Sequence, residues 1–145
     1  MKEIIKKPGG IIIPSDTAHL QVLDEFLEET LRDFRMPDSD IADVAISVTE
    51  LANNAIVHGN KNNPDKIVDV RIKLLSNEVE ITVSDEGSGF NESIIPDPLS
   101  NENILKETGR GIFIVRSLMD KVLITTGKSG NTVVQLFKKF TAEEE

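Results

Sequence analysis

The apolar residues recur with two different periods, and the change of period divides the chain into predicted helices and strands. A step of three to four residues runs from 20 to 34 and again from 41 to 56, which predicts two amphipathic helices. A step of two residues runs from 68 to 74 and from 79 to 83, which is typical of strands with one buried face. A turn-forming Ser-Asn pair separates the two alternating stretches, so we expect them to form a β-hairpin.

The two ends of the chain add further elements. Residues 4–14 are rich in isoleucine and predict a short strand or hairpin edge. We expect a helix over 109–119, opened by Gly-Arg-Gly, and two more strands over 122–126 and 132–140. The stretch 91–108 shows no clear periodicity, and so long a stretch in a compact domain is typical of a lid or a binding loop.

These elements together predict an α/β (α+β) fold built as a two-layer sandwich. About three helices would cover one face of a mixed, mostly antiparallel sheet, with a lid between the second and third main helices. A chain of 145 residues is long enough for one domain with a core of its own. We expect residues 1–140 to form that single domain and residues 141–145 to be a disordered acidic tail.

Composition and charge exclude several classes of function. The net charge of −9 argues against direct binding to nucleic acid or to an anionic membrane, because those partners require a basic surface. The absence of cysteine excludes thiol catalysis, disulfides and cysteine-ligated zinc. The apolar runs are only a few residues long, far short of a membrane span, and we therefore expect a cytoplasmic protein.

The second predicted helix carries polar residues on one edge where they are candidates for chemistry. Glu50 and Asn54 are four residues apart, so an acid and an amide lie side by side on the helix surface. Such a pair suits a metal ion held beside a reactive oxygen. The alternative is a solvated helix end, in which Gly59 supplies a left-handed cap and His58 interacts with the helix dipole.

Asp85 is the most informative single residue. Strand alternation places it on the core face of the second hairpin strand, where an unpaired carboxylate would cost several kcal/mol. It either caps its own turn as an ordinary Asx turn or forms the floor of a pocket that accepts a hydrogen bond from the exocyclic amine of a purine. Thr132 shares the core face of its strand, and it is either a second pocket residue or simply a β-forming threonine.

Two pairs of glycines lie near these candidates. Gly87 and Gly89 allow the backbone to approach a ligand closely. Gly109 and Gly111 precede a predicted helix, so free amides at its start would face an anion, with Arg110 available for a phosphate. The alternative is a helix start that needs glycine only for a tight turn.

The order of these parts is more specific than any one of them. A helix with Glu and Asn four apart is followed by a hairpin ending in Asp-x-Gly-x-Gly, a long loop, Gly-x-Gly opening a helix, and a strand pair bearing Thr132. This order resembles the ATP-binding superfamily of DNA gyrase, the histidine kinases and MutL. Within that superfamily the chain looks most like the small bacterial anti-sigma-factor serine/threonine kinases, over about residues 1–140.

The resemblance implies a role for each candidate residue. Glu50 would be the general base and Asn54 the protein ligand to Mg²⁺. Asp85 would receive the adenine amine. The remaining residues implied to bind the nucleotide are Gly87, Gly89 and Thr132 around the base and Gly109, Arg110 and Gly111 at the phosphates.

The resemblance also implies an activity and partners. The chain would be an ATP- and Mg²⁺-dependent protein serine kinase and an anti-sigma factor. It would phosphorylate a small antagonist protein, sequester a sigma factor and form a homodimer. One alternative is a nucleotide-binding regulatory module without significant kinase activity. Another is a detached histidine-kinase catalytic domain, which is disfavoured because His19 is followed by Leu20 where a phosphoacceptor usually has an acidic neighbour.

Overall fold

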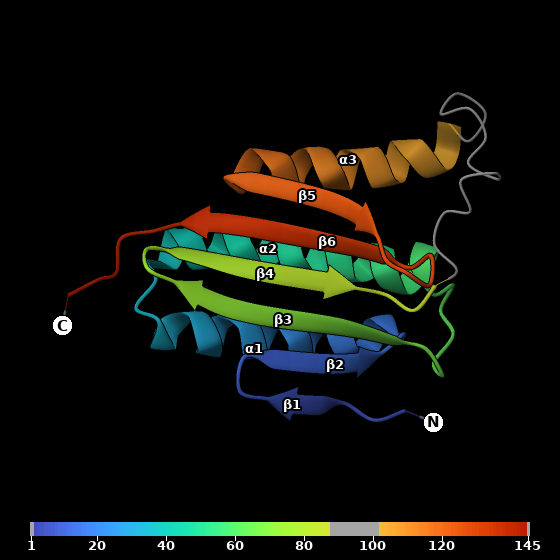
Figure 1. Cartoon of the computed structure of the whole chain (residues 1–145), viewed down its shortest axis with the longest axis horizontal. Helices are drawn as coiled ribbons and strands as arrows, with labels where there is room; N and C mark the ends of the chain where they lie inside the picture. The colour runs from blue at the N-terminus through green and yellow to red at the C-terminus, as the bar shows by residue number, and fades with distance from the viewer. Residues whose placement is uncertain (1, 88–101, 145) are drawn as a thin grey trace.

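The computed structural model describes residues 2–87 and 102–144, with side chains in the second range from 110 onward, as a sheet with helices on one side (Figure 1). Within these ranges the strands are β1 (Ile5–Lys7), β2 (Gly10–Pro14), β3 (Ile67–Leu75), β4 (Glu78–Ser84), β5 (Lys121–Thr126) and β6 (Thr132–Lys139). The helical elements are the 3₁₀-helix η1 (Thr17–His19), α1 (Leu20–Asp33), α2 (Asp38–Asn54), the π-helix η2 (Ala55–Gly59) and α3 (Glu102–Leu118).

The strands lie in the order β1-β2-β3-β4-β6-β5, and each neighbouring pair is antiparallel. The prediction of a hairpin from the alternating stretches is confirmed, since β3 pairs with β4 in the register Ile72↔Ile81. Helices α1 and α2 lie behind the sheet in Figure 1, and α3 runs beside β5 and packs against α2. The predicted two-layer α/β fold is therefore confirmed.

The core lies between the sheet and the helices and is aliphatic. The period of three to four residues brings Leu23, Leu27 and Leu31 of α1 to one fully buried stripe. The two-residue period buries alternate residues of β3 and β4, including Val70 and Ile81, against that stripe. Each of these side chains stabilises the folded state by about 1.5–3 kcal/mol by leaving water.

Helix α3 begins earlier than the sequence predicted. It runs from Glu102 to Leu118, so Gly109, Arg110 and Gly111 lie inside the helix and do not open it. A glycine within a helix costs only about 1 kcal/mol relative to alanine, and burial of Val115 and Met119 at the C-terminal end of α3 offsets that cost. The prediction that free amides of a helix start at Gly109–Gly111 face an anion is wrong.

The end of α2 also differs from expectation. Instead of stopping at a left-handed glycine, the helix widens into η2, where the N–H of Asn60 bonds to the carbonyl of Ala55, five residues back. Gly59 is not among the residues with positive φ, so it does not supply the left-handed cap that the sequence suggested. Among the described helices, none is long and apolar enough to cross a membrane.

Lys138 links the helix layer to the sheet. From β6 its ammonium group donates to the carbonyl of Leu118, at the C-terminus of α3, over 2.6 Å, and to the carboxylate of Asp43 on α2 over 3.2 Å. The Lys138 side chain is only 13% exposed. One cation thus interacts favourably with the negative end of α3 and with an acid of α2.

Candidate functional site

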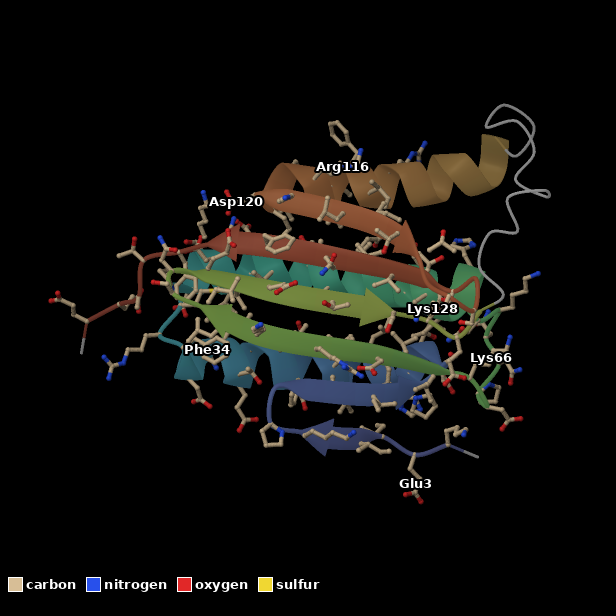
Figure 2. All side chains as sticks on the ribbon, viewed as in Figure 1. Glu3, Phe34, Lys66, Arg116, Asp120 and Lys128 are labelled. Atoms are coloured by element: carbon tan, nitrogen blue, oxygen red, sulfur yellow. The ribbon has the colours of Figure 1, made fainter. Side chains whose placement is uncertain are left out.

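The candidate residues gather at one end of the sandwich. The C-terminal ends of α2 and β4 and the start of β6 meet there, at the right of Figure 1. Lys66 and Lys128 also lie at this end, whereas Phe34 and Asp120 lie at the opposite end (Figure 2).

Asp85 follows β4 directly and is buried, as strand alternation predicted, with 6% of its surface exposed. Its Oδ1 atom accepts hydrogen bonds from the backbone N–H of Gly87 over 3.1 Å and of Thr132 over 3.0 Å. The first bond is the Asx turn that the sequence suggested, and the second ties the carboxylate to the neighbouring strand β6. Both bonds use Oδ1, and no donor among the described residues bonds to Oδ2, which is therefore the oxygen that a ligand could use.

Burial raises the pKa of Asp85 above its usual value because the charged form loses contact with water. The hydrogen bonds from Thr132 and Gly87 and the positive charge of Lys66 oppose that shift, although they do not cancel it. A buried carboxylate with one unused oxygen is a strong acceptor for an amine donor.

Two glycines, Gly59 and Gly87, pack closely around Asp85. A β-carbon on Gly59 would lie 2.8 Å from Cγ of Asp85 and would overlap its Oδ2 atom. A β-carbon on Gly87 would lie 2.7 Å from the carbonyl carbon of Gly59. Both positions therefore need glycine, because the segment at Gly59 and the segment at Asp85–Gly87 approach each other closely here. The sequence had suggested a different reason for Gly59.

The sequence analysis missed Asn60, which is 2% exposed and contacts the segment that follows Asp85. Its Oδ1 atom accepts from the N–H of Glu86 over 3.0 Å. Its Nδ2 atom donates to the hydroxyl of Ser15 and to the carbonyl of Ile67, each over 2.8 Å. In the sequence Asn60 follows a predicted helix in a turn-rich stretch and is typical of a loop residue. Its inward position depends on the π-helix η2 that precedes it, which the sequence did not predict.

Glu50 lies on α2 against α3. A β-carbon on Gly111 would lie 3.0 Å from both Cγ and Cδ of Glu50. Gly111 is therefore the residue that lets α3 approach this carboxylate, and the side chain of Glu50 itself is half-buried. The sequence singled out both residues, but it assigned Gly111 to a phosphate rather than to Glu50.

Asn54 is the last residue of α2, one turn beyond Glu50. Its side-chain amide nitrogen is buried and has no hydrogen-bond partner among the residues that the structure describes. A flip of the side-chain amide exchanges its nitrogen and its oxygen with almost no change of shape, so the oxygen can occupy the same position. A buried amide atom without a partner is costly, and it fits a ligand atom that pairs with it or a metal ion that takes the oxygen.

In the ranges that the structure describes, no group of three or more His, Asp or Glu side chains is placed to hold a metal ion. Mg²⁺ does not need such a group, because it keeps several waters and takes phosphate oxygens together with one or two protein oxygens. A single side-chain oxygen from Asn54 is compatible with that coordination.

The remaining candidates differ in how closely they join this site. Thr132 reaches Asp85 through its backbone, donating with its N–H and accepting the N–H of Asp85 over 3.2 Å. Arg110 is exposed on α3, one residue before Gly111, and Gly109 lies in the same helix. Gly89 lies outside the described residues.

Comparisons with known proteins match most of the chain. The model of the histidine kinase-like ATPase domain matches residues 13–137. An anti-sigma F factor of Clostridium botulinum is 31% identical over 103 residues, which cover 70% of this chain and 72% of that protein. The serine-protein kinase RsbW of Staphylococcus aureus is 33% identical over 112 residues, covering 72% of this chain and 69% of the relative.

Two solved structures share the fold. The RsbU and RsbW domains of a Mycobacterium tuberculosis protein superpose with a TM-score of 0.64 at 19% identity, over 96% of this chain and 33% of that longer one. The histidine kinase domain of a blue-light activated Erythrobacter litoralis protein superposes with a TM-score of 0.56 at 20% identity, over 88% of this chain and 62% of the other. Since the sequence relatives match at higher identity, the chain belongs to the histidine kinase-like ATPase domain family, in the group that contains the small anti-sigma serine kinases.

Proposed function

We propose that this protein is an ATP-dependent protein serine kinase that also acts as an anti-sigma factor. One observation carries the proposal: Asp85, a buried carboxylate with an unused oxygen, lies at the same end of the fold as Glu50 and Asn54. The relatives named anti-sigma F factor and serine-protein kinase RsbW support the proposed activity.

In this proposal the base of ATP binds at Asp85. The Oδ2 atom of Asp85 accepts a hydrogen bond from the exocyclic amine of adenine. Because Gly87 and Gly59 have no side chains, the base can approach this carboxylate closely. Thr132 lies beside the base, and Gly89 is assigned to the base site by the family resemblance alone. The exposed guanidinium of Arg110, with Gly109 next to it, interacts with the phosphates.

Glu50 acts on the attacking oxygen. Its carboxylate accepts the proton of a serine hydroxyl as that oxygen bonds to the γ-phosphorus, and ADP leaves with the electrons of the broken bond. Close packing of Gly111 limits where the Glu50 carboxylate can lie, which favours a fixed base. Mg²⁺, held by the side-chain oxygen of Asn54 and by phosphate oxygens, would neutralise the charge of the triphosphate.

The name of one relative, anti-sigma F factor, supports a sigma factor as a partner. We propose that a sigma factor is sequestered in one nucleotide state, that a serine of a small antagonist protein is phosphorylated, and that the protein works as a homodimer. The proposed compartment is the cytoplasm, where both ATP and the transcription machinery are found.

Calorimetric titration with ATP and ADP in the presence of Mg²⁺ tests the nucleotide site, and it suits a chain that has no Trp or Tyr. We expect binding in the micromolar range, about −8 kcal/mol. Labelled ATP and a small antagonist protein from the same genome then test transfer, with a Ser→Ala variant of the acceptor as control. Binding without transfer to any acceptor would identify a nucleotide-binding regulatory module instead, and failure to bind would overturn the proposal.

A further inference from the structure

Asn60 uses every polar group it has. Besides the three side-chain bonds to Glu86, Ser15 and Ile67, its own N–H bonds to the carbonyl of Ala55 over 2.7 Å, and its carbonyl accepts from Asn63 over 3.1 Å. A buried amide is costly unless its atoms are paired, and here the side chain is paired completely. Such a satisfied network holds its members in one geometry.

The network reaches the ends of three strands. Ser15 follows β2, Ile67 begins β3, and Glu86 comes two residues after β4. The hydroxyl of Ser15 also donates to the carbonyl of Lys66 over 2.7 Å, which closes the link between the β2 and β3 ends. Asn60 therefore connects the segment after β4 to the ends of β2 and β3 through hydrogen bonds.

This segment carries the carboxylate of the proposed base site. Asp85 and Gly87 are joined by their Asx turn, and the amide between them, that of Glu86, is the one that Asn60 binds. Thr132 holds the same turn from the β6 side. The direction of the free Oδ2 atom of Asp85 is thus set by contacts from both sides of the turn.

We propose that Asn60 is a positioning residue that orients Asp85 toward the exocyclic amine of the base, and that it thereby contributes to the selection of adenine over 6-oxopurines. The inference rests on the proposed function, because it assumes that Asp85 binds the base. Asn60 does not touch the base in this proposal; it acts through the backbone of Glu86.

The chain offers a matched control in Ser15. Ser15→Ala removes one acceptor of the Asn60 amide and leaves the bond to Glu86 in place, whereas Asn60→Ala removes the bond to Glu86 as well. Both variants leave buried polar groups unpaired and are expected to lower the thermal midpoint. Only the loss of the Glu86 bond is expected to change which base is bound.

The experiment measures dissociation constants for ADP and for inosine diphosphate, in which an oxygen replaces the exocyclic amine. We expect the wild type to bind ADP at least about tenfold more tightly than inosine diphosphate, the discrimination that one well-placed polar contact provides. In Asn60→Ala we expect ADP binding to weaken about tenfold with inosine diphosphate nearly unchanged, so that the ratio approaches one. Ser15→Ala is expected to keep the wild-type ratio.

Circular dichroism establishes that each variant is folded at the temperature of the titrations. A folded Asn60→Ala with the wild-type ratio would overturn the inference and leave the proposed function intact. If Asn60→Ala does not fold, Asn60→Ser takes its place, and an unchanged ratio there has the same meaning. A wild type that binds neither diphosphate would instead overturn the proposed function and this inference together.

Discussion

Glu50 of α2 and Gly111 of α3 pack so closely that no side chain fits between them. A β-carbon on Gly111 would come within 3.0 Å of Cγ and Cδ of Glu50. It would also overlap the Oε1 atom of Glu50, and contacts shorter than 3.0 Å are essentially absent from folded proteins. The identity of residue 111 and the position of the Glu50 carboxylate are therefore coupled. The proposed base depends in this way on a residue of another helix.

Glu50→Ala is expected to leave ATP binding nearly intact while reducing phosphoryl transfer by about 10²–10⁴-fold, the usual contribution of a general base. The reason is that Glu50 acts on the attacking oxygen and not on the nucleotide. Calorimetry for ATP and single-turnover transfer of labelled phosphate measure the two effects separately. Wild-type transfer by the variant would refute the assignment.

Gly111→Ala is expected to lower transfer although alanine is the better helix former by about 1 kcal/mol. The added methyl group must displace the Glu50 carboxylate or move α3. Ser117→Ala on the exposed side of the same helix is the matched control, and its transfer rate should equal that of the wild type. Equal rates for both variants would show that the position of Glu50 is not critical.

Asp85→Asn separates binding from stability. Asparagine keeps an oxygen for the N–H groups of Gly87 and Thr132 but replaces Oδ2 with a donor, so we expect ADP binding to be lost.

Burial raises the pKa of Asp85, so the native state holds its proton more tightly than the unfolded state does. The wild type therefore loses stability as pH rises from the usual aspartate pKa through the raised one, and Asp85→Asn lacks this loss.

Urea unfolding followed by circular dichroism below and above that pH window measures the difference. The free energy of unfolding of the variant, relative to the wild type, should increase with pH. A constant difference across the window would mean that Asp85 has the same pKa in the folded and unfolded states.

Gly59→Ala is expected to weaken ADP binding strongly. Gly59 does not have a positive φ, so its backbone accepts alanine, and the effect must come from overlap of the new methyl group with Asp85. Gly10→Ala in β2 is the control, because its β-carbon would meet only the carbonyl oxygen of Val70, at 3.3 Å, and the side chain of Arg71. Titration with ADP compares the two, and equal affinities would argue against a base site at Asp85.

Lys138→Met is expected to destabilise the fold by about 1–3 kcal/mol, because it leaves the Leu118 carbonyl and the Asp43 carboxylate without their cation. Lys139→Met, which changes an exposed neighbour, should alter the free energy of unfolding by less than about 0.5 kcal/mol. Urea unfolding measures both. Similar values for the two variants would show that Lys138 does not stabilise the α2–α3–β6 contact.

The sequence by itself determined the layers of this protein, because burial imposes the periods of helix and strand directly on the order of residues. The hairpin of β3 and β4, the stripes of α1 and α2 and the inward position of Asp85 all follow from those periods. The order of motifs also identified the family, since several motifs in one order are more specific than any one of them alone.

Only the tertiary structure decided the details that depend on contacts between segments far apart in the chain. Helical propensity near Gly109 did not reveal that α3 begins at Glu102, because packing of its later residues sustains a helix through two glycines. The sequence also did not predict the roles of Gly59 and Asn60. The π-helix η2 places Gly59 against Asp85 and Asn60 against Glu86. Local sequence sets the period of an element, whereas close approach between backbones is fixed only when the elements are packed together.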